Sequence, residues 1–76
     1  MNEDARSIVC KKLKDYELER DLEFWKFHID KAQEGLDRWK PQHKEALRVD
    51  LMWRLETSKD WVEAVQTEQK ERSDNE

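Results

Sequence analysis

A long stretch of this chain repeats its apolar residues at the spacing of one helix face. Between Leu18 and Trp39 they recur at alternating intervals of four and three. This spacing marks the seam of an α-helix that packs along its length on another helix. The pattern therefore predicts an all-α protein. We call these residues the first stripe: Leu18, Leu22, Trp25, Ile29, Ala32, Leu36 and Trp39.

The same predicted helix carries further apolar residues away from the first stripe. Phe24 and Phe27 fall on its far side, in a second set that Arg20 interrupts. A helix that is apolar on two opposite sides needs more than one neighbour. In the second half of the chain, Val49 and Trp53 repeat this two-sided pattern. The members of the second stripe are Val9, Leu13, Tyr16, Phe24, Phe27, Val49 and Trp53.

The size and composition of the chain favour association. A chain of 76 residues forms one domain at most, and so small a domain commonly needs disulfides, a metal or oligomerisation. Cys10 is the only cysteine, so no internal disulfide can form. Charged residues make up 45% of the chain, which has one Gly and one Pro. Such a composition suits long, solvated helices, and we expect the chain to form a homo-oligomer, most simply a dimer.

Pro41 is the one clear break in the helical pattern. It suits the first position of a new helix and disfavours helical geometry at Lys40. We therefore predict a first helix over about 3–39, capped by Asn2 and passing through Gly35, and a second over about 41–70. Residues 1–70 form a single helical-hairpin domain in this prediction, and residues 71–76 a disordered tail.

A tight connection at Lys40 makes the two helices antiparallel neighbours, so that facing residues have numbers summing to about 80. Residues 8–13 would then face polar residues 67–72 and need cover from outside the hairpin. Two such hairpins would form an antiparallel four-helix bundle. The alternative is one long helix, kinked at Pro41, that associates with another chain. The predicted pairs are Leu18–Val62, Trp25–Leu55, Ile29–Leu51 and Ala32–Leu47.

Catalytic and metal-binding patterns are missing from the sequence. Neither His28 nor His43 has a carboxylate or a second histidine one helical turn away. Cys10 would lie roughly 27 Å along the same helix from His28, too far for activation, and is expected to be a small buried residue. The neighbouring carboxylates fall on exposed faces. We predict no enzymatic activity, no metal and no cofactor; the carboxylate pairs are Asp15/Glu19, Glu19/Glu23 and Glu56/Asp60.

Basic residues gather at two places, but the net charge is −4. Lys11, Lys12 and Lys14 form one group, followed closely by acidic residues. The other surrounds the predicted hairpin turn and could contact an anion: Arg38, Lys40, His43, Lys44 and Arg48. The acidic balance weighs against nucleic-acid binding. With no apolar run of about 18 residues and no signal-peptide pattern, we expect a cytoplasmic protein that does not enter a membrane.

Large aromatic residues give the strongest indication of function. Four Trp, two Phe and one Tyr are many rings for so small a core, and Trp and Tyr are enriched at interfaces. Phe24 and Trp25 are expected to point to different sides of their helix. We predict a non-enzymatic interaction module, or small regulator, that self-associates and binds a protein partner through its apolar and aromatic helix faces. The second stripe is the candidate interface, and the spacing leaves open which stripe faces the interior of the hairpin. The alternatives are an acidic nucleic-acid mimic that inhibits a DNA- or RNA-handling protein, and a weak nucleic-acid binder through the basic turn.

Overall fold

The computed structural model describes residues 2–74, with side chains from Ala5 onward. It has three helices, α1 (Asn2–Lys12), α2 (Asp15–Arg38) and α3 (Glu45–Asp74), and residues 2–74 contain no strand. The prediction of an all-α protein is confirmed. The expected cap by the side chain of Asn2, and residues 75–76 of the predicted tail, lie outside the described part.

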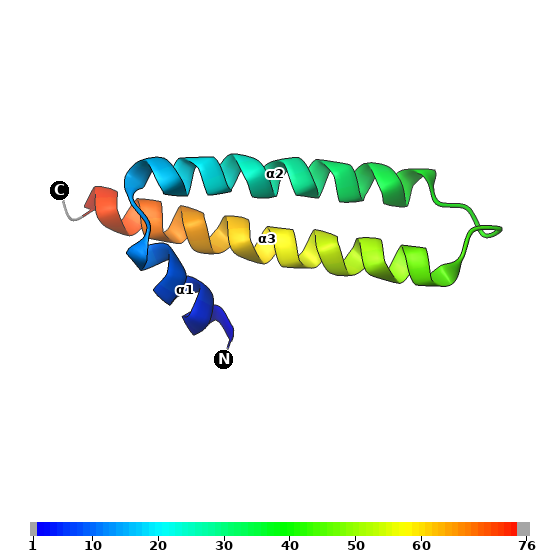
Figure 1. Ribbon diagram of the computed structural model, residues 1–76, viewed down its shortest axis with the longest axis horizontal. Coiled ribbons are helices and arrows are strands. Elements are labelled where there is room, and N and C mark those ends of the chain that lie inside the picture. Colours follow the sequence, from blue (N-terminus) through cyan, green and yellow to red (C-terminus); the bar gives the residue numbers. More distant parts are fainter. Residues whose placement is uncertain (1, 75–76) are drawn as a thin grey trace.

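Helices α2 and α3 run side by side in opposite directions along most of the 53 Å length of the molecule (Figure 1). The alternative of one long helix kinked at Pro41 is therefore wrong. At the end where both termini lie, α1 turns back against the C-terminal half of α3 (Figure 1). None of the three helices has an apolar stretch long enough to cross a bilayer.

The register of α2 against α3 differs from the predicted one. Trp25 stacks on Trp61, six positions beyond the predicted partner Leu55. Gly35 lies against Leu51, since a Cβ at Gly35 would come within 3.0 Å of both Leu51 methyl carbons. Helix α2 continues past Gly35, as predicted, and the missing side chain lets Leu51 approach closely.

The register shift follows from the connection between α2 and α3, which is longer than predicted. Residues 39–44 form the turn, and α3 begins at Glu45 instead of Pro41. Pro41 lies inside the turn, which is closed by a hydrogen bond of 2.8 Å from the His43 N–H to the Lys40 carbonyl. At its other end α3 continues to Asp74, so the prediction of disorder is wrong for residues 71–74.

The predicted continuous helix over 3–39 is also wrong, because the chain bends at Leu13 and Lys14. Lys14 has extended backbone angles, and its N–H donates to a Glu17 carboxylate oxygen at 2.8 Å. This bond caps the start of α2. The bend brings α1 onto α3. Part of α1 is thereby buried, as the apolar residues in 8–13 require.

A small core lies where the three helices meet. Cys10, Leu18 and Val65 are fully buried there, and they are packed against the half-buried Leu13, Leu22, Trp61 and Ala64. Toward the turn, Ala32, Leu55 and Ser58 are also buried between α2 and α3. The core is thus thin, and much of the apolar surface of the chain stays outside it.

Candidate interaction surface

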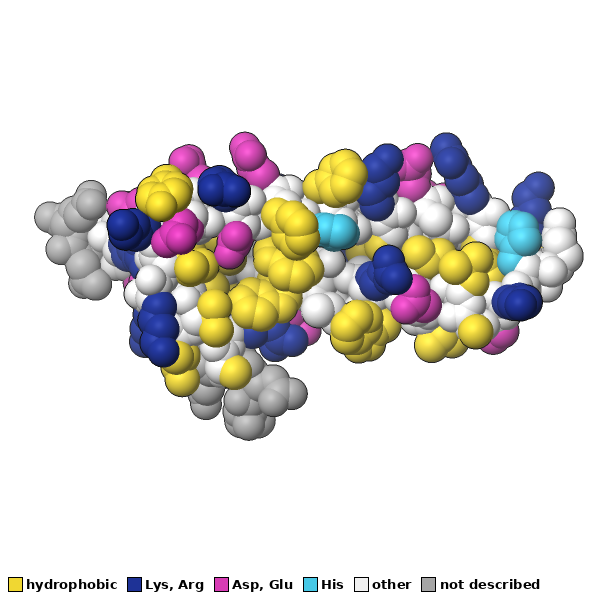
Figure 2. Space-filling model, viewed as in Figure 1, with side chains coloured by type: hydrophobic (Ala, Val, Ile, Leu, Met, Phe, Trp, Pro, Cys, Tyr) yellow, Lys and Arg dark blue, Asp and Glu magenta, His cyan; other side chains and the backbone are white. Residues whose placement is uncertain are grey.

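Five rings from α2 and α3 form a continuous aromatic cluster on one face of the molecule. Trp25 of α2 and Trp61 of α3 stack with centroids 5.7 Å apart and planes inclined by 6°. Phe24 meets the edge of Trp25 at 5.0 Å, and His28 lies 4.4 Å from Phe24 and 5.8 Å from Phe27. Offset-stacked and edge-to-face contacts at such distances are attractive beyond the area that they bury. Figure 2 shows hydrophobic side chains gathered over the middle of α2 and α3 on this face.

A cation lies at each end of the aromatic cluster. The Arg6 guanidinium of α1 is 5.7 Å from the Trp61 ring, and the Lys31 ammonium is 5.5 Å from the Phe27 ring. Each cation also has an acidic neighbour, Asp60 at 3.7 Å from Arg6 and Glu34 at 3.8 Å from Lys31. The Arg6 Nε is buried without a hydrogen-bond acceptor. Because each cation lies over a ring, both add cation–π attraction to the ends of the aromatic cluster.

The cluster corrects one step of the sequence argument. Phe24 and Trp25 were expected to point to different sides of the helix, yet their rings touch edge to face on one flank. Phe24 and His28 are four residues apart, a spacing that alone could have indicated their contact. The contact of Trp25 with Trp61 depends on the register of α3, and the predicted register excluded it.

Most of the second stripe is exposed on the single chain. Trp53 is the most exposed residue of the second stripe, with 65% of the Trp53 surface accessible to solvent. Leu13 is the exception, because it packs against the buried core. The structure brings Phe24 and Phe27 together through His28, whereas Val9, Tyr16, Val49 and Trp53 take no part in the aromatic cluster. The exposed large apolar residues are Ile8, Val9, Tyr16, Phe24, Phe27, Leu47, Val49, Met52 and Trp53.

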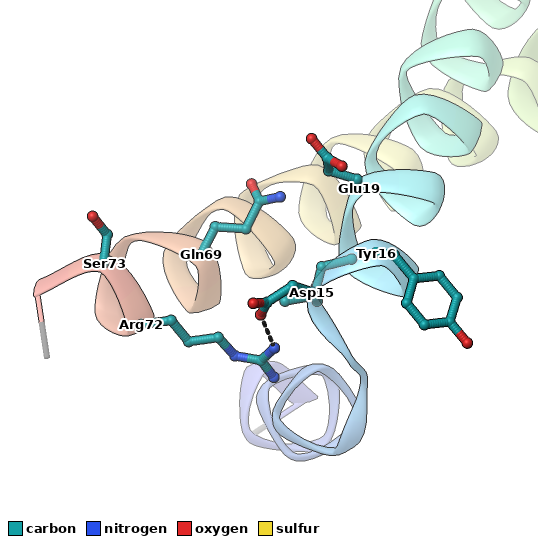
Figure 3. A pocket seen from close by; sticks show the side chains of 7 residues that line it. Asp15, Tyr16, Glu19, Gln69, Arg72 and Ser73 are labelled. Carbon is teal, nitrogen blue, oxygen red and sulfur yellow. Dashed lines mark hydrogen bonds and ion pairs between the residues drawn. The ribbon is translucent and has the colours of Figure 1, made fainter. Parts of the chain in front are cut away.

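A second site lies where α1, the start of α2 and the end of α3 meet, which we call the open end. Arg72 of α3 extends toward Asp15 across the end of α1, while the Tyr16 ring points away (Figure 3). Its guanidinium donates to Asp15 at 2.7 Å and to the Leu13 carbonyl at 2.6 Å. A third bond, of 2.8 Å, reaches Glu68. An open pocket beside these contacts is lined by Asp15, Tyr16, Leu18, Glu19, Gln69, Arg72 and Ser73.

Arg72 is the residue that the sequence pattern failed to single out. It also donates to the Cys10 and Lys11 carbonyls, so it satisfies the carbonyl end of α1. Its hydrogen bonds to Glu68 and Asp15 raise the pKa of the guanidinium further above its usual value. The partners in α1 and α2 are more than fifty positions away in sequence, so no local pattern could have revealed this role.

The basic residues at the turn are partly paired with acidic ones. Arg38 lies 3.3 Å from Glu34, and Arg48 forms a salt bridge with Glu45 at the start of α3. The hydrogen bond from Arg48 lowers the pKa of Glu45. His43 uses its Nδ1 to accept from the Lys40 N–H at 3.0 Å. Lys40 and Lys44 are exposed, so the turn presents its positive charge mainly through these two side chains.

Cys10 is the side chain that the sequence offered as a possible nucleophile. Cys10 is buried, as predicted, and its burial raises the pKa of the thiol, with Glu68 and Asp21 adding to the effect. A thiol held in its neutral form is a poor nucleophile. Among the described side chains, no three His, Cys, Asp or Glu residues are grouped so that they could hold a metal ion.

Comparison of the chain with protein-family models, with curated proteins and with solved structures finds no match.

Proposed function

We propose that this chain is a non-enzymatic helical interaction module whose exposed apolar and aromatic helix faces pair with a second copy of itself and bind a protein partner. The observation that carries the proposal is the exposure of Phe24 and Phe27 within the aromatic cluster, together with the exposed Trp53. Large exposed apolar patches mark interaction sites on small proteins. A second hairpin packed on this surface would complete a four-helix bundle.

The alternative of a nucleic-acid mimic has less support. A mimic needs acidic groups arrayed with few basic neighbours, but here the two signs alternate along α2 and α3. Asp50 pairs with Arg54 at 2.9 Å, and Glu34 lies between Lys31 and Arg38. Direct binding of nucleic acid through the turn has similarly little support, because Arg38 and Arg48 already have acidic partners.

The proposal is tested by placing a charge in the exposed surface. Phe27→Asp puts a carboxylate where the association should exclude water, and a buried charge without a partner is costly. We expect the dissociation constant of the dimer, measured by sedimentation equilibrium, to rise by at least about tenfold, which is 1.4 kcal/mol.

The matched control is Gln66→Asp, which adds the same charge at an exposed position of α3. It should leave the dimer intact. A dimer that persists unchanged in Phe27→Asp would assign the association to another face. Capture experiments with the same two variants test the partner: binding to any co-purifying protein should be lost in Phe27→Asp and kept in Gln66→Asp.

A further inference from the structure

The bend between α1 and α2 is not caused by the residues that form it. Leu13 and Lys14 are both good helix formers, and the chain has no Gly or Pro before Gly35. Local preference therefore favours one helix running from α1 into α2, as the sequence pattern predicted. The local bond from the Lys14 N–H to Glu17 supports the bend, and further contacts come from elsewhere in the molecule.

Arg72 supplies those contacts, and they exist only in the bent form. Its guanidinium binds the carbonyl of Leu13, which the bend leaves without a backbone partner, and that of Cys10, which accepts from the Leu13 N–H only three residues later. In a continuous helix the same carbonyls would accept from N–H groups four residues later. Straightening the chain would thus replace the hydrogen bonds from Arg72 with backbone hydrogen bonds, and the total number of hydrogen bonds would change little.

The surface that α1 covers has a definite chemistry. Arg6 and Cys10 lie four residues apart, so one face of α1 presents both to α3, and Leu13 follows three positions later in the bend. Cys10 joins Val65 in the core, and Arg6 lies between Asp60 and the Trp61 ring. Residues 5–14 contain four basic and no acidic residues, whereas residues 60–74 contain five acidic and two basic ones. The surface on α3 therefore fits a basic helix with a small apolar residue at its centre.

We propose that α1 is exchanged between two copies of the chain. The bend at residues 13–14 straightens, α1 and α2 become one helix, and α1 of each copy docks on α3 of the other. An identical sequence can remake the contacts of Arg6 and Cys10 between chains, and exchange of an identical element is a low-cost route to a dimer. This association uses the open end and goes beyond the proposed function, which uses the aromatic cluster.

The experiment fixes the bend in the full-length chain. Lys14→Pro suits the backbone angles of the bent form, because Lys14 has a φ of −78°, close to that of proline, but it removes the N–H that donates to Glu17. Glu17→Ala removes the same bond while permitting the straight helix, and it controls for that loss. Lys14→Pro excludes a continuous helix, in which proline would clash with the preceding turn. We expect the dissociation constant of the exchanged dimer, measured by sedimentation equilibrium, to rise by at least about tenfold. Lys14→Ala, the matched control, permits the straight helix and should keep the dimer.

A second variant should shift the equilibrium between the bent monomer and the exchanged dimer toward the dimer. Arg72→Gln removes the contacts that favour the bent form, so the exchanged dimer should become tighter. Arg54→Gln, an exposed arginine on the same helix, should have no effect. If Arg72 only supported the fold, its replacement would weaken the dimer. Dissociation of the dimer in Arg72→Gln would therefore overturn the proposal.

The outcomes separate this exchange from the proposed function. A dimer that survives Lys14→Pro but is lost in Phe27→Asp overturns the exchange and keeps the aromatic surface as the interface. The reverse result keeps the exchange and overturns the aromatic interface. If Lys14→Pro fails to fold, oxidation of Val65→Cys decides, because Cys10 meets Val65 in the core. Exchange predicts a disulfide-linked dimer, and a purely intrachain disulfide overturns it.

Discussion

The two ends of the α2–α3 pair are closed by different kinds of contact. At the turn, the Trp39 indole N–H donates to the Lys44 carbonyl at 3.1 Å, and Arg48 lies over the Trp39 ring at 5.7 Å. All these partners are close in sequence. At the open end, Arg72 is 57 positions from Asp15 and 62 from Cys10. The turn can form by itself, whereas the open end needs three helices in place at once.

The largest difference between the ends should appear when a leucine is truncated at each. Leu18 is fully buried at the open end, while Leu47 near the turn is 49% exposed. Leu18→Ala should lower the free energy of unfolding by about 2–5 kcal/mol, from lost burial and the cavity left behind. Leu47→Ala should lower it by less than about 1.5 kcal/mol.

Urea unfolding of the two leucine variants beside the parent chain measures this difference. Equal losses would mean that the turn carries as much of the core as the open end does, and the contrast would fail.

The sequence predicted the long helices because their apolar spacing is a local property. The spacing from Leu18 to Leu36 predicts most of α2, and the continuation past Gly35 is confirmed. It could not predict the bend at Leu13, because that depends on Arg72 at the far end of the chain. It also placed Pro41 at the start of a helix, although a proline suits a turn equally well. With that choice the predicted register paired Trp25 with Leu55, whereas Trp25 stacks on Trp61.

The turn should respond only locally to the loss of its own hydrogen bond. Trp39→Phe keeps a ring beneath Arg48 but removes the indole N–H that reaches Lys44. The expected loss in the free energy of unfolding is about 0.5–1.5 kcal/mol, the usual net value of one hydrogen bond. Hydrogen exchange should quicken at residues 39–44 and stay unchanged in α1. Faster exchange in α1 would show that the two ends are coupled.

The smallest effect belongs to the thiol at the open end. Burial raises the pKa of Cys10 above its usual value of 9.0, so the folded chain holds this proton more tightly than the unfolded chain. Its contribution to stability is therefore complete below pH 9.0 and decreases as the pH rises above that value. The difference in stability between the parent chain and Cys10→Ala, from urea unfolding, should shrink across this range. A difference that stays constant with pH would contradict the raised pKa.

The exposed apolar residues of the candidate surface were predictable from the sequence, but the aromatic cluster was not. The second stripe identified Phe24, Phe27 and Trp53 as side chains that a single hairpin leaves exposed, and they are exposed. Trp25 was assigned to the first stripe, and only the true register reveals that it stacks on Trp61 and joins Phe24. Ring contacts across two helices depend on register, which the spacing within one helix does not determine.

Sedimentation equilibrium of the unaltered chain at micromolar concentration tests the central claim most directly. If the exposed rings are covered by a second chain, the measured mass will be twice the 9.3 kDa of one chain. A single species of 9.3 kDa throughout would contradict self-association, and the aromatic cluster would then be exposed to water on a stable monomer.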